Sequence, residues 1–137
     1  MSIGLLIISH ESLGQAMLDI SMKALDVCPL DVQVLGVPLD ADPDIIAHDA
    51  EQIINQLDCG DGVLILTDLC GATPANIACR IASHPPPHKQ VMVVAGLNLP
   101  MLMRVFNYPD LHLTEIAERA MDGGRQGVIL MPGCHEH

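Results

Sequence analysis

Residues 4–18, GLLIISHESLGQAML, contain the end of a predicted strand and the start of a predicted helix, and they indicate the class of fold. An unbroken apolar run, Ile3–Ile8, predicts a strand that is buried on both faces. The polar residues Ser9, His10 and Glu11 end this strand. Leu13–Leu25 then follows an amphipathic pattern that predicts a helix. A buried strand that leads directly into a helix forms the first half of a βαβ unit.

The same alternation of apolar runs and helical patterns continues along the chain. Four more runs predict strands: Val32–Val37, Val63–Leu66, Val91–Ala95 and Val128–Met131. The first four strands start roughly 30 residues apart, which is the length of a strand plus a crossover helix. Helices are expected over Ile45–Leu57, from Thr73–Pro74 onward, over Leu99–Val105 and over Thr114–Met121. The sequence therefore predicts an α/β doubly wound domain with a parallel sheet covered on both faces.

Length and charge limit the function. The 137 residues, of which 50% are hydrophobic, leave room for a single domain, residues 1–137. The net charge of −11 repels polyanions, so neither nucleic acid nor an anionic membrane surface is expected as a partner. A phosphate would have to be held by backbone amides and a helix N-terminus, because few cations are present. A macromolecular partner should present a basic face.

The sequence favours a cytoplasmic protein. No signal peptide or transmembrane segment is expected, because the first apolar run is short and has no basic leader. The cysteines are odd in number and form no C-x-x-C pair, so neither a disulfide framework nor a zinc knuckle is indicated. A reducing compartment fits this pattern best.

The candidate site lies where the predicted strands end. Ligands of open α/β sheets bind beyond the carboxyl ends of the strands, where the strand order reverses. If the first and third strands are neighbours there, His10 and Asp68 lie within reach of each other, since adjacent strands are roughly 5 Å apart. A carboxylate that accepts a proton from one imidazole nitrogen leaves the other nitrogen as a nucleophile.

A turn that follows Asp68 completes this candidate site. Gly71, Ala72 and Thr73 lead into a helix at Pro74 and offer backbone amides and a hydroxyl to a phosphate. The turn lacks the G-x-x-x-x-G-K-[ST] pattern, so ATP is not expected as a direct donor.

Other interpretations remain open. A lone histidine after a strand is more often a surface residue, and Asp68 could be an ordinary turn cap. The Cys134–His137 cluster raises the possibility of a metal-dependent hydrolase, but a terminal ligand set makes a weak site, and we expect neither a metal nor a cofactor. A regulatory module in which His10 is only a sensor residue is also compatible with the sequence.

Three blocks of sequence resemble the mannose-family IIA components of the bacterial phosphotransferase system. They are GLLIISHESLGQAML (residues 4–18), LTDLCGATPANIA (residues 66–78) and AGLNLPML (residues 95–102). The resemblance implies a phosphotransferase whose histidine, here His10, accepts a phosphoryl group from phospho-HPr and passes it to a IIB component for sugar uptake. It assigns Asp68 as the partner of His10 and Thr73 as the hydroxyl residue. It also places Leu69, Asn98, Leu99, Pro100 and Met101 at the site.

The resemblance further implies an architecture and partners. Four parallel strands are expected in the order 2-1-3-4, with an antiparallel edge strand, Val128–Met131, that is usually exchanged in a homodimer. Because no linker or IIB domain follows in this sequence, the IIB component is expected to be a separate protein. The alternative is a regulatory phosphorelay in an incomplete phosphotransferase system. Ala72 and Ala75 stand where the family usually has Gly and Phe, which should alter loop shape or partner contacts more than chemistry.

Overall fold

A four-stranded parallel sheet forms the centre of the computed structural model, which describes residues 2–25 and 28–133. Its strands are β1 (Gly4–His10), β2 (Asp31–Val37), β3 (Val63–Thr67) and β4 (Val91–Ala95). They are ordered β2-β1-β3-β4, and each neighbouring pair is parallel. The predicted α/β class and strand order are therefore confirmed.

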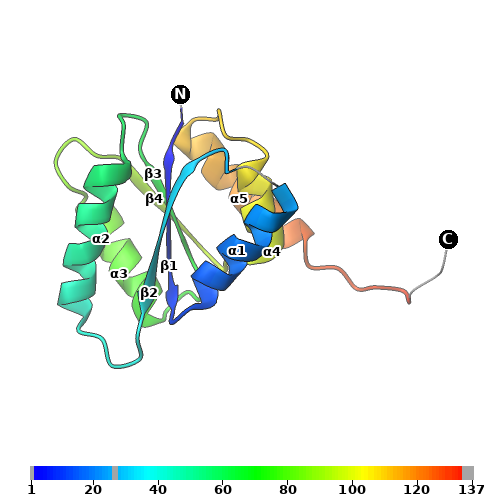
Figure 1. Cartoon of the computed structure of the whole chain (residues 1–137), viewed down its shortest axis with the longest axis horizontal. Coiled ribbons are helices and arrows are strands. Elements are labelled where there is room, and N and C mark those ends of the chain that lie inside the picture. The colour runs from blue at the N-terminus through cyan, green and yellow to red at the C-terminus, as the bar shows by residue number, and fades with distance from the viewer. Residues whose placement is uncertain (1, 26–27, 134–137) are drawn as a thin grey trace.

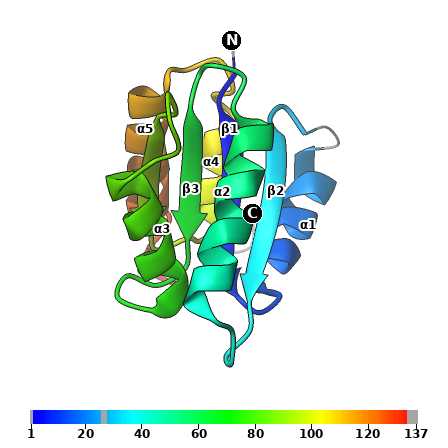
Figure 2. The same ribbon diagram turned by 90° about the vertical axis from the view of Figure 1, so that its left-hand side faces the viewer.

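Five helices cover the two faces of the sheet. They are α1 (Leu13–Leu25), α2 (Pro43–Leu57), α3 (Thr73–Ser83), α4 (Leu99–Phe106) and α5 (Leu113–Gln126). Helices α2 and α3 lie on one face, and α1, α4 and α5 lie on the other (Figure 1). Figure 2 looks onto the face that α2 and α3 cover. None of the helices in residues 2–25 and 28–133 has both the length and the apolar character needed to cross a membrane.

Strand β1 is buried because both of its faces pack against helices. Leu5 and Ile7 belong to the core beneath α4 and α5, whereas Leu6 and Ile8 belong to the core beneath α2 and α3. All four side chains are fully buried, and each contributes roughly 1.5–3 kcal/mol of hydrophobic stabilisation. Two cores that share one strand explain why the sequence of β1 shows no polar alternation.

Helix starts gather at the edge where the strands end. The Asp42 carboxylate accepts a hydrogen bond from the Asp44 amide at 2.9 Å and caps α2. The Asn98 side chain accepts one from the Met101 amide at 2.9 Å and caps α4. Helix α3 begins at Thr73, with Pro74 in its first turn. The N-termini of α2, α3 and α4 therefore each follow a strand end and lie at the edge that carries His10.

The expected fifth strand is not formed in this chain. Residues Val128–Met131 lie outside any strand and lead away from the sheet beyond α5 (Figure 1). Their side chains are 65–96% exposed. The apolar, branched sequence suits a strand, but none of the described residues pairs with it. The described residues therefore form four strands and no antiparallel edge strand, and an edge strand exchanged between two copies stays a prediction.

Candidate functional site

His10 and Asp68 form the centre of the candidate site. His10 is the last residue of β1, and Asp68 follows β3 directly, next to Thr67, which is paired with Ile8. One carboxylate oxygen, Asp68 Oδ2, accepts a hydrogen bond from the His10 amide at 3.0 Å and lies 2.8 Å from His10 Nδ1. The expected proximity of the two side chains is therefore confirmed. The backbone contact also fixes the carboxylate relative to the end of β1.

The Asp68 carboxylate sets the tautomer of the His10 ring. Burial alone would raise the pKa of Asp68, but hydrogen bonds from the His10 amide and ring, together with attraction to the ring, outweigh burial and hold this pKa below its usual value. An ionised carboxylate can only accept hydrogen bonds, so His10 Nδ1 carries the proton. His10 Nε2 makes no hydrogen bond with the residues that the structure describes. In a neutral ring with this tautomer, Nε2 holds the free lone pair.

His10 lines a small cavity of about 100 Å³. The other lining residues come from β2 and the loop after it (Val37, Pro38, Leu39, Ala41), from the start of α2 (Pro43) and from the start of α3 (Thr73, Pro74). No lysine or arginine is among these lining residues. An anion in this cavity would therefore depend on hydroxyl and backbone N–H donors.

The start of α3 brings such donors to the cavity. Thr73 is the first residue of α3 and lines the cavity together with His10. The first-turn N–H groups of a helix lack intrahelical acceptors, and its N-terminus carries partial positive charge. Gly71 and Ala72 precede the helix without lining the cavity, and the Ala72 amide donates to the Leu69 carbonyl at 3.2 Å. The structure thus brings Thr73 to His10, whereas Gly71 and Ala72 shape the turn.

This arrangement occurs in a chain that matches a known family over most of its length. The family model "EIIA-man: PTS system fructose IIA component" matches residues 4–121, from β1 into α5. The chain belongs to this family. Membership places it among the IIA components of phosphotransferase systems.

Individual relatives agree with membership in the EIIA-man family. The chain is 36% identical over 75 residues to the "PTS system mannose-specific EIIAB component" of Escherichia coli (strain K12), a match that covers 53% of this chain and 22% of that protein. A mannose/sorbose-specific IIA subunit from Enterococcus faecalis has the same fold, with a TM-score of 0.86, 23% identity and full coverage of both chains. A PTS IIA protein associated with a fucose utilization operon of Streptococcus pneumoniae superimposes with a TM-score of 0.71 and 25% identity over 88% of this chain and 90% of that one.

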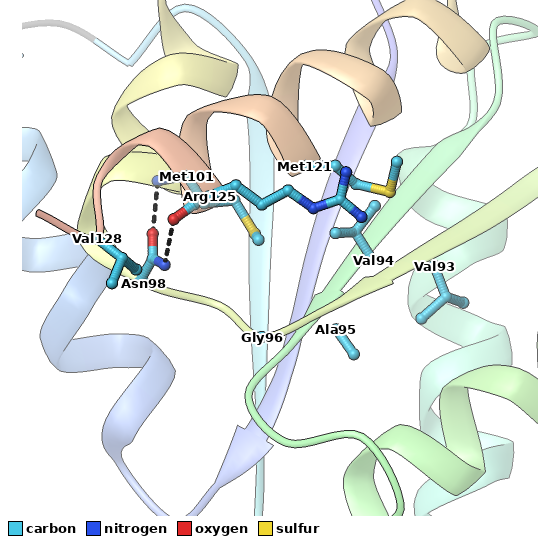
Figure 3. Close-up of a pocket in the computed structure, with 10 residues that line it drawn as sticks. Val93, Val94, Ala95, Gly96, Asn98, Met101, Met121, Arg125 and Val128 are labelled. Carbon is cyan, nitrogen blue, oxygen red and sulfur yellow. Dashed lines mark hydrogen bonds between the residues drawn. The ribbon is translucent and has the colours of Figure 1, made fainter.

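In this EIIA-man chain, Asn98 and Met101 line a different cavity from the one that His10 lines. Asn98 and Met101 line a cavity of about 360 Å³ beside β4, shown in Figure 3. The Asn98 side chain is occupied there, because it accepts from the Met101 amide and donates to the Gly124 carbonyl at 3.1 Å. Leu99, Pro100 and the exposed Leu69 are also absent from the lining of the His10 cavity. Asn98 caps α4 and Leu99, Pro100 and Met101 form its first turn, so the prediction that these residues and Leu69 line the His10 site is wrong for the cavity itself.

Sequence reasoning missed the wall formed by residues 38–43. The expected site residues lie at or after the ends of β1, β3 and β4, and none follows β2, although the carboxyl ends of all parallel strands lie at one edge. The signal was present in the sequence Val37-Pro38-Leu39, where a proline ends an apolar run.

Metal ligation has no support in the described part of the chain. Within residues 2–25 and 28–133, no three His, Cys, Asp or Glu side chains are grouped closely enough to hold a metal ion. The Cys134–His137 cluster lies outside the described residues.

Proposed function

We propose that this chain is a phosphocarrier that accepts a phosphoryl group on His10 from phospho-HPr and passes it to a separate IIB component. The observation that carries the proposal is the 2.8 Å contact between His10 Nδ1 and Asp68 Oδ2. This contact directs the Nδ1 proton to the carboxylate and leaves Nε2 available beside the cavity. The EIIA-man family and the small anion-sized cavity support the same role.

The chemistry requires no proton transfer at His10. The Nε2 lone pair forms a bond to phosphorus while the bond between phosphorus and the donor ring nitrogen breaks, and the donor nitrogen recovers its electron pair. The His10 ring keeps its proton on Nδ1 and gains positive character, which the ionised Asp68 stabilises. The reverse sequence of bond changes passes the group to an acceptor on IIB. Alignment and charge stabilisation supply most of such a reaction.

Backbone and hydroxyl donors would hold the phosphoryl oxygens. Thr73 lies at the N-terminus of α3 and lines the cavity with His10. Its hydroxyl and the first-turn amides of α3 are suited to an anion because the helix dipole reinforces them. This arrangement explains how a chain with a net charge of −11 could bind phosphate without a lysine in the cavity.

The proposal includes a cytoplasmic homodimer that exchanges residues Val128–Met131. These residues are exposed and apolar, and within residues 2–25 and 28–133 strand β4 pairs only with β3. The cavity beside β4 also includes Val128 in its lining. The apolar segment of one copy could therefore complete the β4 edge of another. Deleting residues 128–137 should convert a dimer to a monomer in light scattering, and an unchanged mass would contradict this part of the proposal.

Phosphorylation by purified components tests the proposed function. The protein is incubated with phosphoenolpyruvate, enzyme I and HPr, and its intact mass and the acid lability of any adduct are measured. An acid-labile phosphoryl adduct is expected in wild type and in His48→Ala, which alters an exposed histidine on α2, but not in His10→Ala. The absence of an adduct in wild type would refute the phosphocarrier function. An adduct that no IIB component removes would indicate the regulatory or sensor role.

A further inference from the structure

Glu11, the residue after His10, has an unusual backbone conformation. Its φ angle is +46°, and among the described residues only His88 shares a positive φ without being glycine. The left-handed region is unfavourable for residues with a Cβ atom, so such a residue needs other contacts to hold it. Glu11 is also exposed. Burial therefore does not explain why glutamate occupies this position.

Strand β2 holds the backbone of Glu11. The Glu11 amide donates to the Val37 carbonyl at 3.0 Å, which extends the pairing of β1 with β2 one residue beyond His10. The Glu11 carbonyl oxygen packs against Gly36 so closely that a Cβ atom on Gly36 would lie 2.3 Å from it. Gly36 is thus the position in β2 that permits the left-handed turn after His10.

The Glu11 side chain reaches the loop that forms one wall of the His10 cavity. Its Oε1 accepts a hydrogen bond from the Leu39 amide at 3.1 Å. Leu39 and its neighbours Pro38 and Ala41 line the cavity, and the Leu39 side chain is 88% exposed. A loop with little buried side-chain surface is held mainly by its hydrogen bonds. The contact therefore links the turn after His10 directly to the Pro38–Ala41 loop, which forms one wall of the cavity.

We propose that Glu11 is a positioning residue, which fixes the Pro38–Ala41 wall of the cavity through the Leu39 amide. The inference rests on the proposed phosphoryl transfer at His10. Glu11 does not line the cavity itself, so its effect passes through the loop. The left-handed backbone directs its side chain to Leu39, and Gly36 makes that backbone possible. Because transfer between two proteins depends on alignment, a displaced wall slows the reaction.

Two substitutions separate the side-chain contact from the backbone conformation and from the charge. Glu11→Gly accepts the positive φ without strain but removes the acceptor for the Leu39 amide. Glu11→Gln keeps an oxygen acceptor and removes only the negative charge. Initial rates of transfer from phospho-HPr are measured for both variants and for wild type. Hydrogen exchange at the Leu39 amide is followed by NMR as a readout that does not depend on transfer.

The proposal predicts that Glu11→Gly slows transfer about three- to tenfold, the effect of losing one net hydrogen bond. It predicts a rate within about twofold of wild type for Glu11→Gln, since the contact is retained. Protection of the Leu39 amide should be lost in Glu11→Gly and kept in Glu11→Gln. Wild-type rates or wild-type Leu39 protection in Glu11→Gly would overturn the proposal. So would a Glu11→Gln variant as slow as Glu11→Gly, because charge would then be the cause.

Failure of this inference differs from failure of the proposed function. A wild-type protein that accepts no phosphoryl group overturns the function and, with it, any role of Glu11 in transfer. A phosphorylated wild type beside an equally fast Glu11→Gly variant overturns the positioning role alone.

Discussion

Replacing Asp68 by asparagine tests the role of the carboxylate in most detail. Asp68 Oδ2 accepts from both the amide and Nδ1 of His10, and an asparagine oxygen placed there could still accept both bonds. The substitution therefore keeps the ring tautomer and removes the negative charge. A hydrogen bond to a charged group contributes about 1.5–3 kcal/mol and a neutral one about 0.5–1.5 kcal/mol. The midpoints of these ranges differ by about 1.25 kcal/mol, which corresponds to roughly eightfold slower transfer if the difference is expressed fully in the transition state.

The same substitution should also lower stability. Asp68 Oδ1 is buried and has no hydrogen-bond partner among the residues that the structure describes. An asparagine with its oxygen at the Oδ2 position would place an NH₂ group where the unpaired Oδ1 lies, so the loss should come from replacing two charge-assisted hydrogen bonds by neutral ones, about 1 kcal/mol for each bond. Urea denaturation measures this cost and shows whether the variant is folded under the assay conditions.

Rapid-quench transfer from radiolabelled phospho-HPr gives the rate. Asp19→Asn is the matched control. It removes an exposed carboxylate on α1, away from the residues that line the His10 cavity, and should leave the rate unchanged. A folded Asp68→Asn variant that transfers at the wild-type rate would refute charge stabilisation by Asp68. Asp68 would then act only as an ordinary turn cap.

Three further predictions follow from neighbouring contacts. The pKa of Asp68 is lower in the folded protein than the value of about 3.9 expected for the unfolded chain. The ionised form of Asp68 therefore stabilises the fold above about pH 4, and this stabilisation is lost as the pH falls through the folded-state pKa. Urea titrations at several acid pH values should therefore show a steeper loss of stability in wild type than in Asp68→Asn, and parallel curves would contradict the assignment. Gly36→Ala should lower the free energy of unfolding by about 1–3 kcal/mol, because the new Cβ would lie 2.3 Å from the Glu11 carbonyl oxygen, and an unchanged urea midpoint would argue against that close approach. Thr73→Val should slow transfer roughly tenfold, because it removes one hydrogen bond to a charged group, whereas the control Thr114→Val on α5 should leave the rate unchanged. If Thr73→Val transfers as fast as wild type in quenched-flow assays, the Thr73 hydroxyl does not bind the phosphoryl group.

The sheet could be predicted from sequence because burial on two faces leaves a clear pattern. Ile3–Ile8 contains no polar residue, and in the structure its side chains alternate between the two cores. The order of strands depended on resemblance, since spacing alone does not say on which side of β1 each strand lies. The contact between His10 and Asp68 could be anticipated once β1 and β3 were taken as neighbours.

Other features depend on three-dimensional contacts that the sequence does not display. Val128–Met131 has the composition of a strand, but strand formation needs a paired neighbour, and none of the described residues supplies one. Asn98 follows β4, where a ligand-binding residue could lie. Its side chain instead accepts a hydrogen bond from an amide of α4 and donates one to a carbonyl of α5. The positive φ of Glu11 had no local signal, because glutamate rarely takes this conformation and its support comes from β2.

NMR of the phosphorylated protein tests the central claim most directly. The chain is labelled with ¹⁵N in its histidine rings, phosphorylated with phosphoenolpyruvate, enzyme I and HPr, and examined for coupling between phosphorus and ring nitrogen. We expect a single phosphohistidine at His10, with phosphorus bonded to Nε2 and a proton retained on Nδ1. A phosphoryl group on Nδ1 of His10, or on any other histidine, would contradict it.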